Sequence, residues 1–471
     1  MKQLILIGTL ALILCTANAQ SSYTLKQCIE TALANNLQVK QQDLARQAAS
    51  NNFDQSRYNR LPQLSAGMGY GINNGRSIDP FTNGYITQQL NSSNANAQLQ
   101  VPVFNGLKIM HSIRQNENAF RAAELDLQQE KDNLTLNIIL NYLQVLNNED
   151  LLVLAEKQAA VTKAQVERME VLHKEGAVAP SELTDLKGQY ASEQINVMNA
   201  RVSLETARLT LVQLMNVPYE KGMTLSREGS SMEALATDLT AESIYQKALQ
   251  QLAIVKANQF RQQSAGNAVK VAEADRYPTI SLFGQLSTNY SSAALRNTFL
   301  NTTDQPNGDY VTVNNAKIPV ISTVNNFSSH KISFGNQFSN NVGTYAGVSL
   351  NVPLFTAFQT RTRIRQAKLQ QQNTVVQGDI LKNQLRQNIE TAWLNCTNAW
   401  DRFNTLKEQV SAFEESFRAA EARFNEGAWN SVQYLIVKNN LDRARANLVT
   451  AGYEFQLRSR ILDFYQGLQR W

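Results

Sequence analysis

The chain carries one short run of residues twice, each time where a strand-like pattern changes into a helix-like one. Val101–Gly106 (VPVFNG) returns as Val352–Ala357 (VPLFTA), at an offset of 251 in the numbering. Before each copy, residues alternate between apolar and polar, which is the two-residue period of a strand; after it, apolar residues recur at helical spacing. Proline suits such a boundary, because it lacks the N–H that a central strand position needs and precedes the helix that it would otherwise interrupt. The sequence therefore predicts a duplicated strand-to-helix unit.

The first copy of the unit begins with a helical pattern from Thr24 to about Tyr58, which ends before Pro62. Two alternating strands follow, separated by a polar loop around residues 73–93, and the second strand has an uncharged polar face. Their apolar rows are Leu64, Ala66, Met68, Tyr70 and Ile72, then Ala95, Ala97, Leu99, Val101 and Val103. The spacing predicts a helix followed by a β-hairpin.

A very long helix is predicted after Gly106, since no proline occurs before Pro180. If it is helical to Lys174, it has about 70 residues and a length of about 100 Å, which exceeds any ordinary globular helix. Gly176 suits a helix end, and Pro180 suits the start of a new helix. The returning helix carries apolar residues in the three-and-four steps of a heptad: Val197, Ala200, Leu204, Ala207, Leu211 and Leu214. These spacings predict a long helix and a returning partner with coiled-coil packing.

The second half repeats this plan with a change of offset. Pro62 recurs as Pro278, at a smaller offset of 216 in the numbering, and two further alternating strands follow. Their apolar rows are Ile280, Leu282 and Leu286, then Ala346, Val348, Leu350, Val352 and Leu354. The extra residues that enlarge the offset from 216 to 251 are expected in a long polar loop around positions 291–340. A second long helix, from about Phe358 to Asn425, and a final heptad helix complete the repeat.

The first residues have the pattern of a secretory signal peptide. Lys2 precedes an apolar run, and Ala17–Ala19 forms a small-residue cleavage site that would leave Gln20 as the mature N-terminus. Cys15 raises lipid anchoring as an alternative, although the bulky Leu14 before it fits a lipobox poorly. No later stretch has the roughly 20 apolar residues of a membrane-spanning helix. Strands that are only half apolar escape such a search, so a membrane location stays open.

The sequence shows no catalytic constellation. His111, His173 and His330 are far apart and lack ligand spacing, and neither a phosphate-binding loop nor an H-E-x-x-H motif occurs. Cys28 and Cys396 are too few for a disulfide framework, and two buried thiols are favoured over a bridge. The net charge of +5 is mild and unclustered, so nucleic acid is not indicated as a partner. We expect no enzyme activity, no cofactor and no metal site.

Four strands of about ten residues cannot close a barrel, because single-chain barrels start at about eight strands. Open sheet edges cannot sit in lipid, so either the sheet packs on the helices in water or several subunits pool their strands. A soluble, half-buried sheet would show the same alternation. The signal peptide, the long uncharged loops rich in Asn and Ser, and the absence of a globular core favour the shared barrel.

The order of these features resembles the TolC-type outer-membrane efflux channels. The resemblance rests on the signal peptide, two repeats of helix, β-hairpin, long helix, turn and helix, and the V-P-[VL]-F junctions, and it covers essentially all of the mature chain. It implies a mixed α+β membrane protein, a homotrimer in which four strands per chain form a twelve-stranded barrel in outer-membrane lipid. That barrel would be continuous with a periplasmic α-helical barrel, in a Gram-negative bacterium, with most of the chain in the periplasm.

The function implied by the resemblance is a passive exit duct of a tripartite efflux or type I secretion system. Its partners would be a periplasmic adaptor protein and an inner-membrane transporter, which supplies the energy. Family channels dock their adaptors at the two helix-to-helix turns, and the matching positions are Gly176, Ala177, Val178, Ala179, Gly427 and Ala428. Helix termination alone would also explain a glycine there. The prolines assigned to the barrel–helix junctions are Pro62, Pro102, Pro278 and Pro353.

Family channels close their periplasmic mouth with acidic residues near the second turn, and this sequence departs from that pattern. Glu182 matches the carboxylate of the first turn, but the aspartate positions of the second turn fall on Gln433 and Ile436, and a basic position falls on Trp429. An acidic ring at that level is therefore not supported. We expect a constriction built from polar and apolar side chains instead.

The sequence map has eight segments. They are 1–19, signal peptide; 20–60, first-repeat helix; 61–104, first barrel hairpin; 105–216, long helix, tip turn and return helix; 217–240, equatorial link; 241–276, second-repeat helix; 277–355, second hairpin with its long loop; and 356–471, long helix, tip turn and return helix. The alternative function is a periplasmic coiled-coil adaptor or a structural protein without a pore. An adaptor usually has one helical hairpin with flanking β-domains, and a structural coiled coil needs no alternating strand pairs.

Overall fold

The computed structural model describes residues 22–219, 221–227 and 240–468. The predicted signal peptide, with Cys15, and about half of the predicted link at 217–240 lie outside the described residues. The chain divides into two compact units. The helical unit comprises Met1–Asn52, Asn116–Ala265 and Leu369–Trp471, and the sheet unit comprises Phe53–Gln115 and Gly266–Lys368.

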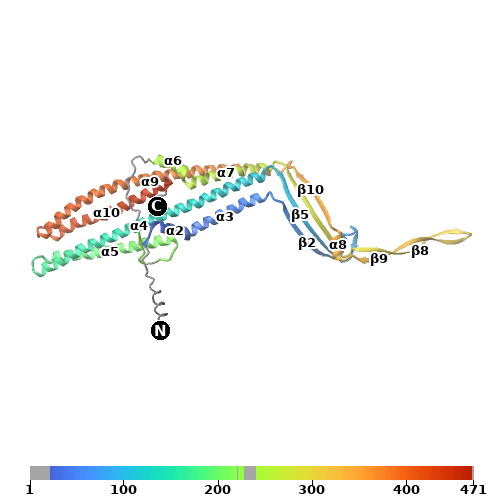
Figure 1. Ribbon diagram of the computed structural model, residues 1–471, viewed down its shortest axis with the longest axis horizontal. Helices are drawn as coiled ribbons and strands as arrows, with labels where there is room; N and C mark the ends of the chain where they lie inside the picture. The colour runs from blue at the N-terminus through green and yellow to red at the C-terminus, as the bar shows by residue number, and fades with distance from the viewer. Residues whose placement is uncertain (1–21, 220, 228–239, 469–471) are drawn as a thin grey trace, which may run out of the picture. The chain divides into compact units, whose positions relative to one another are not determined.

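Long helices dominate the helical unit, and four of them continue into the sheet unit along the chain (Figure 1). The helices of the first repeat are α2 (Leu25–Asn35), α3 (Leu37–Tyr58), α4 (Lys108–Lys174) and α5 (Pro180–Met215). Those of the second are α6 (Ala241–Gln251), α7 (Ala253–Ala274), α9 (Gln359–Asn425) and α10 (Ser431–Tyr465). A short parallel pair joins β1 (Ser22–Tyr23) to β6 (Thr224–Leu225). None of the described helices is both long and apolar enough to cross a membrane.

The helix that opens each repeat is broken, which corrects the single helices expected at 20–60 and 241–276. The break lies at Asn36 in the first repeat and at Leu252 in the second, which are equivalent positions at the smaller offset, and both residues have extended backbone. The Asn36 side chain caps the helix that follows, accepting hydrogen bonds from the N–H groups of Gln38 and Val39 at 2.8 and 3.1 Å. Asparagine competes with the helix in this way because its side chain mimics a backbone acceptor. At Leu252 the capping side chain comes from another helix, because the N–H of Ile254 donates to Gln129 Oε1 of α4 at 3.1 Å.

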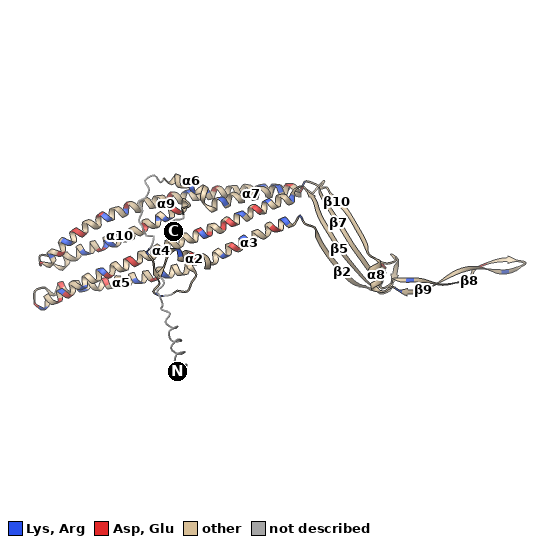
Figure 2. Cartoon of the chain, in the orientation of Figure 1, with Lys and Arg blue, Asp and Glu red and all other residues tan. Residues whose placement is uncertain are grey.

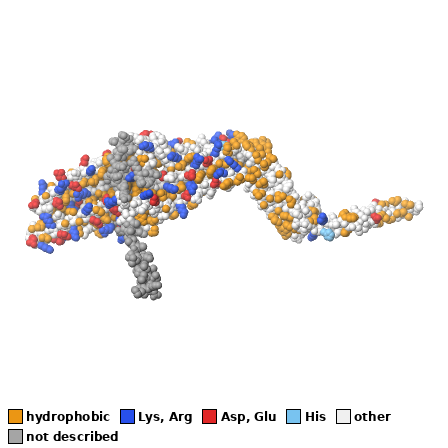
Figure 3. All heavy atoms as spheres, viewed as in Figure 1, with side chains coloured by type: hydrophobic (Ala, Val, Ile, Leu, Met, Phe, Trp, Pro, Cys, Tyr) orange, Lys and Arg blue, Asp and Glu red, His pale blue; other side chains and the backbone are white. Residues whose placement is uncertain are grey.

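Four antiparallel strands form the main sheet, in the order β10-β7-β5-β2. Their bounds are Gln63–Asn73 for β2, Leu90–Asn105 for β5, Thr279–Ser291 for β7 and Gly343–Asn351 for β10. None of the four strands contains an acidic or basic residue, and Figure 2 shows them free of charged colouring. Apolar side chains gather over the same strands in Figure 3.

The two hairpins of the sheet have the same register, which supports the duplication directly. Gln63 pairs with Gln100 in the first hairpin, and Thr279 pairs with Asn351 in the second. Thr279 is the repeat counterpart of Gln63 at the offset of 216, and Asn351 is the counterpart of Gln100 at the offset of 251. The two offsets found in the sequence therefore map nine of the eleven pairs of the first hairpin onto the nine pairs of the second.

The prediction of a polar loop at 291–340 is wrong, because most of this segment forms a separate long hairpin. Strands β8 (Leu295–Val313) and β9 (Ala316–Lys331) pair with each other, and helix α8 (Phe334–Asn340) follows. The turn consists of Asn314 and Asn315, both at positive φ, a conformation that asparagine tolerates in two-residue hairpin turns. The loop at 73–93 also contains a small hairpin, formed by β3 (Arg76–Ile78) and β4 (Tyr85–Thr87).

The core of the helical unit consists of separate apolar clusters. One surrounds α4 and includes Cys28 of α2; another surrounds α9 and includes Cys396. Both cysteines are free and buried, so the bridge considered as an alternative is not formed. Burial raises the pKa of Cys28 to about 12 and that of Cys396 to about 11.

We expect neither thiol to react with iodoacetamide at pH 8 in the folded protein, because the thiolate is the reactive form and both groups are buried and protonated. After unfolding in guanidinium without a reducing agent, two labels per mature chain should appear by mass spectrometry. Labelling that requires prior reduction would instead indicate a disulfide.

Candidate functional site

The two helix-to-helix turns have the same backbone structure. The N–H of Gly176 donates to His173 O and that of Ala177 to Leu172 O, at 3.0 and 2.9 Å. In the second turn, Gly427 and Ala428 donate to the carbonyl groups at the equivalent positions of α9, at 3.1 and 2.9 Å. This is the Schellman pattern, in which glycine takes the left-handed conformation; φ is +76° and +74° at the two glycines. Helix termination therefore explains both glycines.

The predicted docking residues lie at the surface of these turns. Gly176, Ala177, Ala179, Gly427 and Ala428 are exposed. Val178 is half-buried and packs on an apolar cluster beneath the turns. A Cβ added to either glycine would meet no atom within 4 Å. The small side chains thus leave both turns open to a surface that approaches closely.

An apolar cluster and side-chain contacts hold the two helical hairpins together near their tips. All four long helices contribute to the cluster, whose buried members are Val166, Met169, Leu186, Phe424 and Tyr434. The rings of Phe424 and Tyr434 stack with their centroids 4.5 Å apart. Arg168 of α4 donates to the carbonyl of Asn425 at 2.9 Å, and Ser431 donates to Asp185 of α5 at 3.1 Å.

The four predicted gate residues are not joined to one another by any hydrogen bond or ion pair within the described chain. The guanidinium of Arg423 lies 5.3 Å from the ring centroid of Trp429. Gln433 belongs to a capping box, in which its side chain accepts from the N–H of Asn430 at 3.2 Å. Ile436 is exposed, and Glu182 is half-buried in the first turn of α5. Two of the four side chains therefore have local structural roles.

A buried charge cluster lies between α5 and α10, and sequence reasoning missed it. Lys438 Nζ donates to Glu193 Oε1 at 2.8 Å and to Asp442 Oδ2 at 2.6 Å. The side chains of Lys438 and Glu193 are only 3% and 6% exposed. Burial raises the pKa of Asp442, although Lys438 beside it acts in the opposite direction. The sequence contains one signal of this cluster: Lys438 lies between apolar positions in the heptad spacing of α10.

The strand-to-helix junctions share an unusual backbone conformation. Two successive residues have positive φ at each: Gly106 and Leu107 at 63° and 65°, and Ala357 and Phe358 at 47° and 61°. Pro102 lies two residues beyond Gln100, the last residue that β5 pairs with β2. Pro353 lies likewise two residues beyond Asn351, the last residue that β10 pairs with β7. The prolines thus occupy equivalent places in the two hairpins.

The remaining junction prolines precede the other strand of each hairpin. Pro62 comes directly before β2 and Pro278 directly before β7. Close by, Asp275 joins the starts of the two long helices: it accepts from Lys108 at 2.7 Å and pairs with Arg363 at 3.4 Å.

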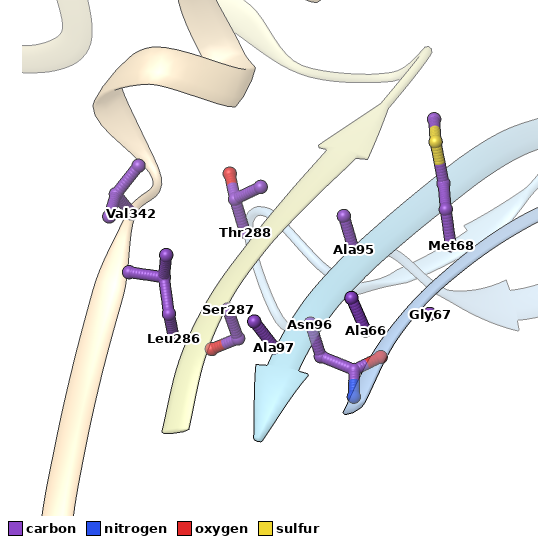
Figure 4. Close-up of a pocket in the computed structure, with 10 residues that line it drawn as sticks. All are labelled: Ala66, Gly67, Met68, Ala95, Asn96, Ala97, Leu286, Ser287, Thr288 and Val342. Carbon is purple, nitrogen blue, oxygen red and sulfur yellow. The ribbon is translucent and has the colours of Figure 1, made fainter. Parts of the chain in front are cut away.

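The sheet presents an apolar face with a shallow groove of about 450 Å³. Figure 4 shows its lining, in which the small side chains of Ala66, Ala95 and Ala97 lie between those of Met68 and Leu286. No titratable side chain lines the groove. Its chemistry suits contact with hydrocarbon rather than catalysis. Among the described residues, no cluster of His, Cys, Asp and Glu could hold a metal ion.

Helix α5 carries an apolar stripe that the chain itself leaves exposed. Ile195, Met198, Val202 and Leu209 follow one another at heptad spacing, and all four are exposed. Their counterparts on α10, at the larger offset, are less exposed: Ala446, Val449, Tyr453 and Arg460. Tyr453, the counterpart of Val202, packs against the α4 cluster, and its hydroxyl donates to Asp150 at 2.8 Å. This face of α10 is therefore partly covered within the chain, at Tyr453 by the α4 cluster, whereas the equivalent face of α5 is exposed.

Comparison with known proteins agrees with this architecture. A family model described as "Outer membrane efflux protein" matches residues 28–217 and 244–467. "Outer membrane protein TolC" of Escherichia coli K12 is 22% identical over 436 residues, which is 92% of this chain and 79% of that protein. The structure of CusC has a TM-score of 0.75 at 16% identity, covering 95% of this chain and 92% of that one. The CmeC outer membrane channel of Campylobacter jejuni has a TM-score of 0.73 at 15% identity, covering 94% and 85%.

The two segments of the family match coincide with the two structural repeats. The fold class is confirmed as a helix-rich mixture of α and β structure, and the family consists of transport channels rather than enzymes. The chain therefore belongs to the outer membrane efflux protein family, as a TolC-like protein of the Gram-negative outer membrane.

Proposed function

We propose that three copies of this chain form a passive exit duct across the outer membrane. The observation that carries the proposal is the four-stranded sheet, which has two free edges, β2 and β10, and no charged residue in any strand. A sheet with open edges cannot sit in lipid. Three copies would join edge to edge into a closed barrel of twelve strands, which satisfies every backbone group.

Exposed apolar residues at the junctions support a membrane-facing position for the sheet unit. Leu354, Phe355 and Phe358 are exposed beside Arg276 and Arg361. Aromatic and basic side chains of this kind anchor proteins at the boundary between hydrocarbon and headgroups. The Pro-containing junctions would then lie at the periplasmic rim of the barrel.

The bare stripe on α5 supports assembly of the helical unit from the same copies. Because Tyr453 of α10 packs on α4 of its own chain, its counterpart Val202 of α5 would pack on α9 of the next copy. Repeating this contact closes a ring of helices, each repeat covering its neighbour. The helical unit would then form a periplasmic tube.

We place the docking site for a periplasmic adaptor at the two Schellman turns. The replacements Ala177→Trp and Ala428→Trp fill exposed positions without changing the left-handed glycines. We expect them to weaken adaptor binding at least about tenfold, the effect of losing one close contact of about 1.4 kcal/mol. Binding of purified adaptor can be measured by surface plasmon resonance, and export by dye efflux. Single-channel conductance is the control and should not change; full adaptor affinity in both variants would exclude the turns as the site.

The closed mouth is proposed to lack the acidic ring of related channels, with Gln433 and Ile436 in its place. Wild-type channels should therefore show weak block by divalent cations in planar bilayers. Gln433→Asp would add one carboxylate per subunit in the first turn of α10, where the helix dipole favours a negative charge, and block should become at least about tenfold stronger, as expected for converging charges. Strong block of the wild type would contradict this account.

The proposed duct predicts a trimer in outer-membrane extracts. Membrane fractionation followed by native mass measurement in mild detergent tests this. A periplasmic adaptor or a structural coiled coil would instead be recovered from the soluble fraction, or with an inner-membrane partner. We assign substrate selection to the inner-membrane transporter, because neither the uncharged sheet nor the small-residue turns present groups that would select a substrate.

A further inference from the structure

The free edges of the sheet carry the most exposed large apolar side chains of its face. Met68 and Tyr70 on β2 and Val348 and Leu350 on β10 are each between 63% and 67% exposed. Neither strand carries a charge or a proline, which are the usual means by which proteins block an open edge. Both edges are therefore competent to pair with another strand.

The pairing of β5 with β7 shows how one hairpin of this chain joins the next. Ala97 lies opposite Leu286, and Leu99 lies opposite Gly284. Adding 251 to the number of a residue in β5 gives its counterpart in the repeat of β10. Subtracting 216 from the number of a residue in β7 gives its counterpart in β2. The pair Ala97–Leu286 thereby becomes Val348 with Tyr70, and Leu99–Gly284 becomes Leu350 with Met68.

We propose that β10 of one copy pairs antiparallel with β2 of the next, with Val348 opposite Tyr70 of the partner subunit and Leu350 opposite Met68 of the partner subunit. The proposal rests on the assembly put forward above and specifies its strand register. The two hairpins of the chain have the same internal register. The barrel is therefore most regular if hairpins pair in the same register within a chain, through β5 and β7, and between copies, through β10 and β2.

The side-chain pattern supports this register independently of the offsets. Apart from Tyr345, the large apolar residues of both strands stand at even-numbered positions, and opposed residues in a sheet share a face. The register places the apolar row of β10 opposite that of β2, and opposes Ser349 to Gly69 of the partner subunit on the other face. A slip by one residue would bring apolar and polar faces together, which a barrel in lipid excludes.

The lengths of the strands support it as well. Strand β5 continues past Pro102 to Asn105, where it pairs with Thr279 of β7. Its counterpart β10 ends at Asn351. In the proposed register, residues 352–356 would gain a partner in the first residues of β2 from the next copy. We expect β10 to lengthen accordingly in the assembly.

Disulfide cross-linking in native outer membranes tests the register. The double variant Tyr70→Cys/Val348→Cys should give covalent dimers and trimers after mild oxidation with copper phenanthroline, visible on a non-reducing gel. The variants Met68→Cys/Val348→Cys and Ile72→Cys/Val348→Cys shift the pair by two residues along the same face. They should cross-link at least about fivefold less, because a disulfide needs a Cα–Cα distance of about 4.4–6.8 Å. Ala97→Cys/Leu286→Cys provides the matched pair within one chain.

The outcomes separate this proposal from the proposed function. Stronger cross-linking of a shifted pair would overturn the register. A native trimer in which none of the three pairs cross-links, while the Ala97→Cys/Leu286→Cys pair does, would overturn the proposed register and leave the duct intact, because β10 and β2 could still pair in another register. A monomeric native mass would overturn both.

Discussion

Replacing Lys438 by methionine is expected to lower the free energy of unfolding by about 3–5 kcal/mol, the usual cost of leaving a buried charge without its partner. Lys438 is the only cation within ion-pair distance of Glu193 among the described residues. Oε2 of Glu193 is already buried and has no hydrogen-bond partner among the described residues. Methionine keeps much of the lysine volume, so the loss should reflect charge rather than a cavity. Urea unfolding of the detergent-solubilised protein, followed by helical circular dichroism, gives the midpoint shift.

The matched control for this substitution is Lys26→Met. Lys26 faces Glu30 at 4.0 Å on the surface of α2, and the two side chains are 79% and 64% exposed. Such pairs contribute about 0–1 kcal/mol. Equal midpoints for the two variants would mean that the buried cluster does not stabilise the tips. A second variant, Glu193→Gln, should recover part of the loss when combined with Lys438→Met, because it removes the stranded charge.

The second large effect is expected from Gly106→Ala at the first strand-to-helix junction. A Cβ there would lie 2.8 Å from the carbonyl oxygen of Ala274 and 2.7 Å from Cβ of Tyr277. Both atoms belong to or adjoin the backbone and cannot swing aside. Left-handed strain of about 1–2 kcal/mol and overpacking of about 1–3 kcal/mol together predict a loss of about 2–5 kcal/mol.

The control separates strain from packing. Gly176 has a similar φ but open space around it, so Gly176→Ala should show only the strain component, about 1–2 kcal/mol. The second junction supports this division, because Ala357 occupies the equivalent left-handed position as a natural alanine. Urea midpoints and the yield of heat-resistant oligomer measure both variants. Equal losses at Gly106 and Gly176 would show that the contact with Ala274 is unimportant.

Much of the fold could be predicted because its signals are periodic and local. The alternation around Ala97 and Val348 identifies strands, and the absence of proline between Gly106 and Pro180 identifies a long helix. The offsets also contain the register of the two predicted hairpins, although the sequence alone did not reveal that β5 and β7 pair and join the hairpins into one sheet. The hairpin at β8 and β9 was missed because its Asn-rich composition is typical of loops, although the Asn314–Asn315 turn was a usable signal.

The sites were less predictable, because they depend on contacts between distant residues. Lys438 and Glu193 are 245 residues apart in sequence, and no local pattern links them. Asn36 interrupts an otherwise helical stripe through a side-chain cap that composition does not distinguish from a surface asparagine. Gln433 was assigned to the gate by position, which did not reveal its capping role, and its place in the gate remains a prediction. The docking role of the turns remains a prediction, since the glycines there also serve as helix ends.

Conductance of the purified protein in a planar lipid bilayer tests the central claim most directly. The protein extracted from outer membranes, with no adaptor, transporter or nucleotide present, should insert and produce discrete, uniform single-channel steps. Those steps should disappear when the oligomer is dissociated before insertion. A protein that inserts as an intact trimer and passes no ions, or that does not associate with lipid at all, would contradict the account.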